Sequence, residues 1–543
     1  MLLIHPVWER FGGELSEYIP VGVPVAIGYL AQYLIQHGHK VKVHDEELET
    51  LDQEKIKNLI IDLPKPYVFG ISVMTASAGR AYELIGWIKK LLPDSIVLLG
   101  GVHPTALPEE SLENGADYVF RGESEVPLLQ FYDKLRNGED PTAVSNISYI
   151  NAENEIVHNP EKDLLRDMDE IEPFPYHLFD YKNPRYRAWF ITRSRGCPYK
   201  CNFCSQRLIT GKTVRYHSTE RIIGLIKFLI NEVGVDYISF TDDIFTLRSN
   251  VFKNDLFELC DRIIKEGLHK KTVFYVQTRA DAIDEEILLK LKSANIIYIG
   301  FGLETGSNRL AKLSDKGESV EDHIEAVKLC KKIGIEPSVF MIYGFPTETK
   351  EERLQGAQLI KELGLHFVKF NNMIPYPGTK LYEDVKNTAQ INVQKHWSNF
   401  NSTLTITRSI FDKTPLPFVP ATTTEWKLKR DIMKANFQFY FQPSLILAMF
   451  LRKRGSNFVL LPEYWFFKPL EIYKIGKVGL NFLINLVVTI LPEKISEIIY
   501  ILVVGNKNIN KPRRRISSKI INPINTEMKN IKLEKKAVPP NIL

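Results

Sequence analysis

Short apolar runs that alternate with helical patterns constrain the fold of the first 140 residues more than any other feature of the sequence. The strand-like runs are MLLIHP, KVKVHD, YVFGISV, SIVLLGG and ADYVFRG. Between the first two, residues 24–38 read PVAIGYLAQYLIQHG, which is apolar at helical spacing and ends at Gly38. This alternation predicts an α/β domain of the Rossmann type, with a doubly wound parallel sheet, over residues 1–140.

Ligands of doubly wound sheets bind in the crevice outside the carboxyl ends of the strands. No G-x-G-x-x-G follows the first strand, which argues against a dinucleotide. The segment GGVHPT after the fourth strand has small residues that would let the backbone approach a bulky ligand, and its His103, taken alone, is better interpreted as a turn histidine without a ligand role. The residues expected on the rim of this crevice are Ser72, Thr75, Gly100, Gly101, His103, Gly122 and Glu123.

The composition is typical of a globular protein, and the low cysteine content indicates a reducing compartment. A chain of 543 residues with 44% hydrophobic residues has enough material for several domains with their own cores. Five cysteines, with no secretory leader at MLLIHPVWER, predict a cytoplasmic location. Residues 141–185 are acidic and interrupted by prolines without a sustained period, so we expect a linker there.

Three of the five cysteines are concentrated in one short loop, which reads RGCPYKCNFCSQ and contains Cys197, Cys201 and Cys204. Disulfide pairing would leave one thiol over, and a zinc ion would lack its fourth ligand. Three thiolates can instead hold three corners of a cubane iron–sulfur cluster and leave the fourth iron open. Cys260 and Cys330 lie on helical patterns among apolar neighbours, and we interpret both as core residues.

A strand followed by C-x3-C-x2-C resembles the radical S-adenosylmethionine (SAM) enzymes. The resemblance implies a partial (β/α)6 barrel over residues 186–400, with the site at the carboxyl ends of its strands. The matching strands are WFITRS, YISFTDD, VFYVQTR, YIGFGLE, EPSVFMIYG and FVKFNNMIP.

The resemblance also assigns residues to SAM. Asp242 and Asp243 stand where the family often has Gly-Gly-Glu, and YGFPTET resembles the stretch that contacts adenine. The alternative for Arg279 and Glu304 is an ion pair at the barrel rim. The expected SAM-binding residues are Phe203, Asp242, Asp243, Gln277, Arg279, Glu304, Gly344 and Pro346, and we identify no separate catalytic residue.

One subgroup of this family joins an N-terminal cobalamin-binding domain to the barrel, and the first 140 residues, with GGVHP and RGESE, are similar to it. The D-x-H-x-x-G motif of many cobalamin proteins is missing, which leaves a vestigial domain as an alternative. The resemblance implies a 4Fe–4S cluster, SAM and cobalamin as cofactors, a flavodoxin or ferredoxin as electron donor, and methylation of an unactivated carbon in a small molecule. The alternatives are a radical cyclase or oxidoreductase similar to the anaerobic magnesium-protoporphyrin ester cyclases, and a non-catalytic iron–sulfur or cobalamin sensor.

The sequence of residues 401–543 indicates fold and function less clearly than the first 400 residues do. Residues 401–505 contain apolar runs that predict a mostly helical region, either capping the barrel or lying in a membrane interface, and the second option would favour a lipid-like substrate. The longest apolar stretch, about 14 residues, is too short to span a bilayer. Residues 506–543 contain ten Lys or Arg and two Glu, a net charge of +8, and we expect a disordered tail there, with contact to anionic lipid as the alternative. Because the basic excess is confined to the tail, we expect no nucleic-acid partner.

Overall fold

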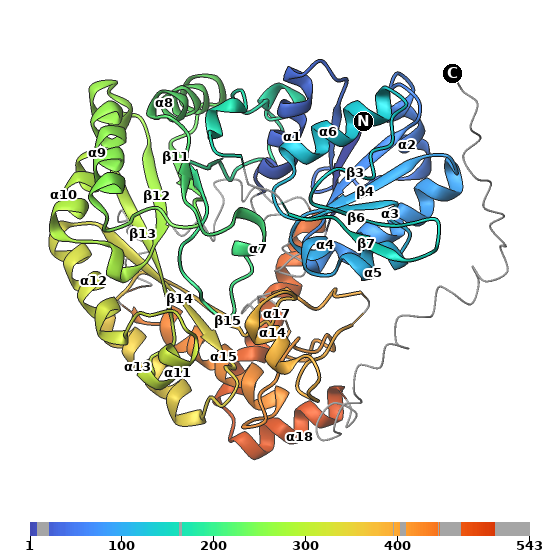
Figure 1. The fold of residues 1–543 in the computed structure, drawn as a ribbon. Coiled ribbons are helices and arrows are strands. Elements are labelled where there is room, and N and C mark those ends of the chain that lie inside the picture. Colours follow the sequence, from blue (N-terminus) through green and yellow to red (C-terminus); the bar gives the residue numbers. More distant parts are fainter. Residues whose placement is uncertain are drawn as a thin grey trace.

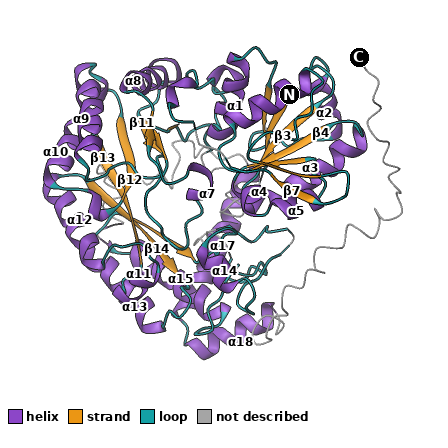
Figure 2. Ribbon diagram, viewed as in Figure 1, coloured by secondary structure: helices purple, strands orange, loops and turns teal. Residues whose placement is uncertain are grey.

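The computed structural model describes residues 1–7, 21–161, 165–394, 396–401, 409–443, 445 and 469–504. Two open sheets, each covered by helices, lie side by side, and a group of C-terminal helices packs below the second (Figure 1, Figure 2). The basic tail of residues 506–543 and part of the apolar segment before residue 469 lie outside the described residues.

The first sheet confirms the doubly wound arrangement. Its five parallel strands follow the order β2-β1-β3-β4-β5, with bounds β1 (Leu2–His5), β2 (Lys42–Asp45), β3 (Val68–Ser72), β4 (Ile96–Gly100) and β5 (Tyr118–Phe120). Leu3 and Leu98 point to one face, where they pack with α1 (Val25–Gln36) and α6 (Glu125–Arg136). Leu2 and Ile4 point to the other face, toward α2 (Gln53–Ile60) and α3 (Ala78–Leu91). Both faces of these strands are therefore buried, as in other parallel sheets.

The segment expected to be a linker contains two further strands of this sheet, β6 (Ile147–Ile150) and β7 (Ile156–His158). Both are antiparallel, and β6 pairs with the edge strand β5 through Tyr149 opposite Tyr118. Runs of four and three residues are too short to show a strand period in an acidic, proline-rich context, and their pairing depends on an edge formed by distant residues. The limits of the domains themselves stay a prediction.

The second sheet has six parallel strands in chain order, which confirms the partial barrel of six β/α units. Its strands are β8 (Phe190–Ile191), β11 (Tyr237–Phe240), β12 (Val273–Thr278), β13 (Ile296–Glu304), β14 (Glu336–Tyr343) and β15 (Phe367–Asn372). Successive strands are joined through α8 (Thr219–Phe228), α9 (Asn250–Lys265), α10 (Glu285–Ser293), α12 (Val320–Ile333) and α13 (Lys350–Leu363). These helices cover the outer face of the sheet (Figure 1).

Local sequence signals set the ends of these helices. Ser319 and Asp322 form a capping box at the start of α12, and Gly334 ends the helix in the left-handed region. Thr349 and Glu352 begin α13 in the same way. Cys260 and Cys330 are fully buried on α9 and α12, which fits their interpretation as core residues.

The C-terminal region is helical, as expected. Its described helices are α14 (Lys380–Val385), α15 (Glu425–Tyr440), α17 (Pro469–Ile490) and α18 (Glu493–Val504). Helix α15 packs against β15 and α13, and α17 packs on α15. Among the described helices, none combines the length and apolarity needed to cross a bilayer.

Candidate functional site

A cavity of about 280 Å³ lies where the carboxyl edge of the first sheet faces the start of the barrel, and we call it the main cavity because residues of both domains line it. One wall comes from the ends of β3, β4 and β5 together with α1, and the other comes from the segment after β8, from α7 (Arg207–Thr210) and from the end of β11. Helix α7 lies between the two sheets (Figure 1). The residues expected in a site that line it are Ser72, Gly100, Gly101, Gly122, Glu123 and Asp243.

Three glycines shape the wall on the first sheet. A Cβ atom added to Gly100 or Gly122 would meet no atom closer than 3.8 Å, so these two residues leave their space to the cavity. Gly101 has another reason to be glycine, because its φ is +100° and a Cβ would lie 2.7 Å from the carbonyl oxygen of Val73. A flat wall of this kind fits a bulky planar ligand such as cobalamin.

Thr75 and His103 do not line the main cavity. His103 is fully buried, and its Nε2 lies 3.1 Å from the hydroxyl of Tyr82. Tyr82 donates to Glu110 (3.0 Å), which also accepts from the indole of Trp397 (2.8 Å). Helix α4 (Val102–Ala106) thus carries the histidine into an internal network that joins the first sheet to the segment after the barrel. This placement supports the interpretation of His103 without a ligand role.

The cysteine loop begins directly after the short strand β9 (Ser194–Arg195) and leads into α7. Gly196 has a φ of +105°, and a Cβ on it would lie 2.1 Å from the carbonyl oxygen of Thr213, so no other residue fits this turn. The N–H of Cys197 donates to the carbonyl of Gly211 (3.1 Å). Cys197 and Cys201 are half-buried and Cys204 is exposed.

The three thiols fit a cluster better than a single metal ion. No group of three His, Cys, Asp or Glu side chains in the described part of the chain surrounds one ion position. A cubane does not need such a group, because each thiolate binds a different iron. Burial raises the pKa of Cys201 to about 12, partly offset by the nearby Lys316 and Arg279. The free loop therefore holds protonated thiols, and iron must displace those protons when it binds.

Asp242 and Asp243 hold the cysteine loop from two sides. Asp242 is buried and accepts from the N–H of Arg193 (2.7 Å) and the hydroxyl of Ser194 (2.8 Å), and burial raises its pKa to about 6. One oxygen of Asp243, Oδ2, accepts from the N–H of Gly196 (2.8 Å) and the hydroxyl of Thr210 (2.6 Å). Only Asp243 faces the main cavity, whereas both oxygens of Asp242 are occupied inside the protein.

Arg279 and Glu304 belong to one network of ion pairs at the barrel rim, which Glu318 and Lys316 connect. The guanidinium of Arg279 stacks on the ring of Tyr199, inside the cysteine loop, at 3.6 Å from the ring centroid, and it pairs with Asp281 at 2.8 Å. Glu304 lies 3.5 Å from Lys316, and burial raises its pKa. Ion pairs are therefore present at the rim, as in the alternative interpretation. Arg279 and Glu304 do not pair directly with each other, because each has other partners.

The remaining residues expected near SAM are spread along the rim. Gln277 is exposed on β12, and Phe203 packs against the apolar cluster that contains α3. The N–H of Gly344 donates to Glu348 (2.5 Å), and a Cβ on Gly344 would lie 3.0 Å from a methyl group of Leu428 on α15. Pro346 is half-buried two residues later. The turn at Gly344 thus follows the end of β14 and packs against the C-terminal region.

The sequence did not predict a buried group of two carboxylates and two guanidiniums beside the main cavity. Arg215 forms two hydrogen bonds to Glu123, both of 2.7 Å, and Arg195 donates to Glu125 at 2.7 Å. Arg215 lies on β10 (Arg215–Tyr216), which pairs with β9 next to the cysteine loop. The two partners of the first pair are 92 residues apart, so no local pattern could reveal them. These ion pairs join the first sheet to the loop that carries the cysteines.

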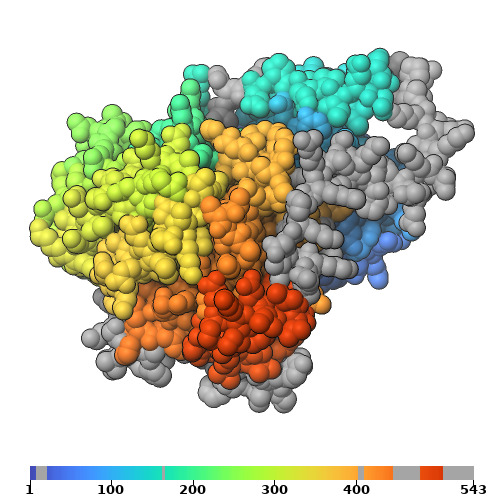
Figure 3. Space-filling view, turned by 90° about the horizontal axis from the view of Figure 1, so that it is seen from below, coloured from blue at the N-terminus to red at the C-terminus, as the bar shows by residue number. Residues whose placement is uncertain are grey.

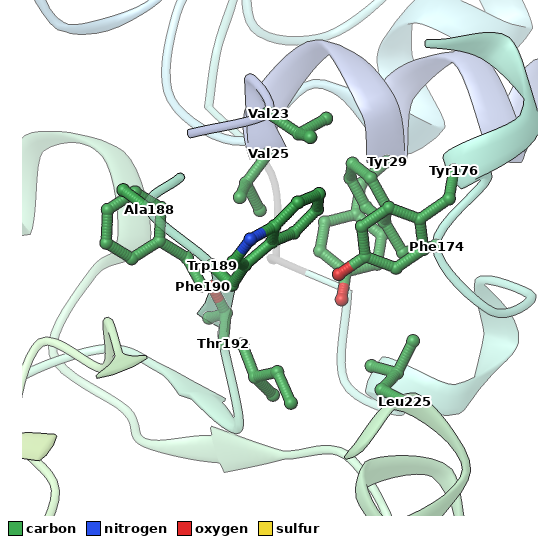
Figure 4. A pocket seen from close by; sticks show the side chains of 11 residues that line it. Val23, Val25, Tyr29, Phe174, Tyr176, Ala188, Trp189, Phe190, Thr192 and Leu225 are labelled. Atoms are coloured by element: carbon green, nitrogen blue, oxygen red, sulfur yellow. The ribbon is translucent and has the colours of Figure 1, made fainter. Parts of the chain in front are cut away.

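A second, much smaller pocket of about 10 Å³ adjoins the main cavity and shares Val25, Tyr29 and Thr192 with it. Figure 4 shows the rings of Tyr29, Phe174, Tyr176 and Trp189 around it. Because this volume is about that of one water molecule, we interpret the pocket as a packed aromatic wall and not as a ligand site.

Comparisons with known proteins agree with this geometry. The family described as "Radical SAM superfamily" matches residues 191–374, and the "B12 binding domain" matches residues 17–131. The chain is 30% identical to an uncharacterized methyltransferase of Pyrococcus horikoshii over 80% of this chain and 91% of the relative. It is 25% identical to the anaerobic magnesium-protoporphyrin IX monomethyl ester cyclase of Cereibacter sphaeroides, over 72% of this chain and 64% of that protein.

Solved structures share the fold over almost the whole chain. The structure of the cobalamin-dependent S-adenosylmethionine radical enzyme OxsB, with aqua-cobalamin and S-adenosylmethionine bound, matches with a TM-score of 0.66 and 18% identity. The match covers 96% of this chain and 77% of OxsB. At this identity the likeness is evidence of a common architecture alone.

Proposed function

The chain belongs to the radical SAM enzymes that carry a B12 binding domain, so that its cofactors are a 4Fe–4S cluster, SAM and cobalamin, and we propose that it methylates an unactivated carbon of a small molecule. When bound, the cluster and SAM supply a radical that removes a hydrogen atom from the substrate, and cobalamin supplies the methyl group.

One observation carries the proposal: the edge of the first sheet and the cysteine loop bound the same cavity. Ser72, Gly100 and Gly122 lie on one side of it, and Arg195 and Gln206, the first and last residues of the cysteine loop, lie on the other. Methyl transfer to a substrate radical requires the methyl donor and the hydrogen-abstracting group to reach the same carbon. A shared cavity meets this requirement, whereas two separate pockets would not.

The chain's own residues would hold the cluster, fix the cysteine loop and keep water from the substrate radical. Cys197, Cys201 and Cys204 would bind three irons of the cluster and leave the fourth for SAM. Asp243 fixes the start of the cysteine loop to the end of α7 through its bonds to Gly196 and Thr210. Apolar side chains on the first sheet, such as Leu98 and Phe120, line the main cavity and would keep water from a substrate radical.

The test is anaerobic reconstitution of the full chain with iron, sulfide and hydroxocobalamin, followed by reaction with dithionite and SAM. We expect one cobalamin per chain and 5′-deoxyadenosine as a product, which disappears in Cys201→Ala. A reconstituted cluster that never cleaves SAM would contradict the proposal and favour the non-catalytic sensor.

The second candidate is a radical cyclase or oxidoreductase, and the similarity to the Cereibacter sphaeroides cyclase favours it. The two candidates differ in their products from SAM. Methylation consumes two SAM molecules per product and releases S-adenosylhomocysteine besides 5′-deoxyadenosine and methionine. With substrate present, S-adenosylhomocysteine in about equal amount to 5′-deoxyadenosine supports the methylase, and its absence supports the cyclase.

Two finer parts of the proposal concern partners. A flavodoxin or ferredoxin would deliver the electron that dithionite supplies in the test. We also propose a lipid-like substrate, supported by the apolar side chains that α17 and α18 expose to solvent. Incorporation of label from methyl-tritiated SAM into a lipid extract would test the substrate class, and incorporation only into the water-soluble fraction would contradict it.

A further inference from the structure

The C-terminal helices α17 and α18 carry apolar side chains on the side that faces solvent as well as on the side that faces the core, unlike the usual surface helix. Eight large aliphatic side chains on these helices are between 48% and 79% exposed: Leu480, Leu483, Val487, Ile490, Ile495, Ile498, Leu502 and Val503. We call this set the apolar face. Apart from Val503, which directly follows Leu502, the residues recur at intervals of three and four along each helix, so they share one side of it.

The opposite side of the two helices is buried and holds several polar groups. Asn485, Thr489 and Ser496 are buried, and Asn485 accepts from the N–H of Ile410 at 2.8 Å. Arg430 on α15 donates to the carbonyl of Leu491 (2.8 Å), in the turn between the helices. These hydrogen bonds fix α17 to the segment that contains Ile410 and fix the turn between the helices to α15, so the apolar face cannot turn inward without breaking them.

Figure 3 shows the red C-terminal residues on the surface of the molecule. Large apolar patches are rare on the surface of monomers in water, and they mark sites of association. Aliphatic side chains on the outer side of a helix are expected where that side meets a medium as apolar as the core.

The segments next to the apolar face in the sequence are cationic and aromatic. Residues 506–543, which begin two positions after α18 ends, carry a net charge of +8. The segment before α17 contains Arg452, Lys453 and Arg454, as well as Tyr464 and Trp465. Basic residues are attracted to anionic lipid headgroups, and Trp and Tyr prefer the boundary between headgroups and acyl chains.

We propose that the apolar face of α17 and α18 docks on an anionic lipid bilayer, with the helices lying in the plane of the interface. A second copy of the chain fits less well, because the basic residues that follow α18 in the sequence complement anionic lipid and not an identical basic chain. The inference concerns where the enzyme lies and is independent of the reaction that it catalyses.

The test is flotation of the full chain with phosphatidylcholine vesicles, with and without phosphatidylglycerol. We expect binding to the anionic vesicles that falls roughly tenfold or more in the double variant Ile498→Glu with Leu502→Glu, since both apolar contact and charge are lost. The matched control is Ile61→Glu with Val251→Glu, which places the same two charges at equally exposed aliphatic positions outside this face and should bind as the parent does.

The charge contribution is tested separately by Arg513→Glu, Arg514→Glu and Arg515→Glu, which should weaken binding to the anionic vesicles by roughly tenfold or more and remove its salt dependence. Far-ultraviolet circular dichroism and 5′-deoxyadenosine formation, both unchanged, would show that the variants fold. Equal vesicle binding by the apolar-face variant and its control would overturn the proposal. A dimer in light scattering that the variant dissociates, without vesicle binding, would overturn it in favour of a second copy.

Discussion

The two walls of the main cavity are built in different ways. On the first sheet the wall is made of backbone and small residues, with Gly100 and Gly122 leaving open space. On the barrel side it is made of polar groups that are already bonded, with Asp243 holding Gly196 and Thr210. The comparison predicts that a large cofactor would fit against the first wall because side chains are missing there, whereas the second wall would place a small reactive group through side chains that are already hydrogen-bonded. The following variants test this distinction.

The largest effect is expected for Gly196→Ala. A Cβ at this position would lie 2.1 Å from a backbone oxygen at a φ of +105°, so the cysteine loop must rearrange. We expect loss of cluster absorbance and a fall in 5′-deoxyadenosine formation of roughly 100-fold or more, because an ångström of misplacement costs that much. The control is Gly224→Ala on α8, where a Cβ meets nothing within 4 Å and should be neutral or slightly stabilising. An intact cluster in Gly196→Ala would show that this turn is not rigid.

A stability change of about 3 kcal/mol is expected for Arg215→Met, because it removes the two hydrogen bonds to the buried Glu123 and leaves it only Arg195, at 3.7 Å. The matched control is Arg309→Met, which breaks an exposed pair with Glu352 and should cost less than about 1 kcal/mol. Urea unfolding of both variants measures the difference. Equal losses would mean that the ion pairs between the first sheet and the cysteine loop do not hold the two walls together.

Removal of the carboxylate in Asp243→Ala should lower SAM cleavage by roughly 10- to 100-fold, since two hydrogen bonds to a charged oxygen are lost. Asp243→Asn keeps an acceptor oxygen and should recover most of the rate. Cluster content by iron analysis and the rate of 5′-deoxyadenosine formation are the measurements. If the asparagine variant is as slow as the alanine variant, the negative charge matters more than the positioning of the loop.

The smallest effect on SAM cleavage is expected on the other wall. Gly100→Val fills the space beside Phe120 and should weaken hydroxocobalamin binding by about tenfold, as overpacking of a fitted site does, with SAM cleavage unchanged. Gly86→Ala on α3, which meets nothing within 4 Å, is the control. An unchanged cobalamin affinity in an absorbance titration would show that cobalamin does not bind against this wall.

Sequence patterns predicted the elements well and their long-range partners poorly. All six barrel strands were recognised, because each is a run of β-branched and aromatic residues followed by a helical pattern. The strands β6 and β7 were missed, since they are short and depend on the open edge of β5. Five of the seven crevice residues line the main cavity, whereas Thr75 does not and His103 lies in an internal hydrogen-bond network. The partners of Asp242, Asp243 and Glu123 were not predictable, because they come from segments between 33 and 92 residues away.

The sequence by itself determined the order of strands and helices, the cysteine spacing that selects a cluster and the glycines that leave room for a large ligand. These features depend on residues close in the chain, through periodicity, backbone conformation and the geometry of one loop. The tertiary structure alone decided that the edge of the first sheet and the cysteine loop share a cavity, that Arg215 joins them, and that α17 and α18 expose their aliphatic side. Each of these results depends on which buried surfaces meet across the fold, and packing between distant segments is not encoded in any local pattern.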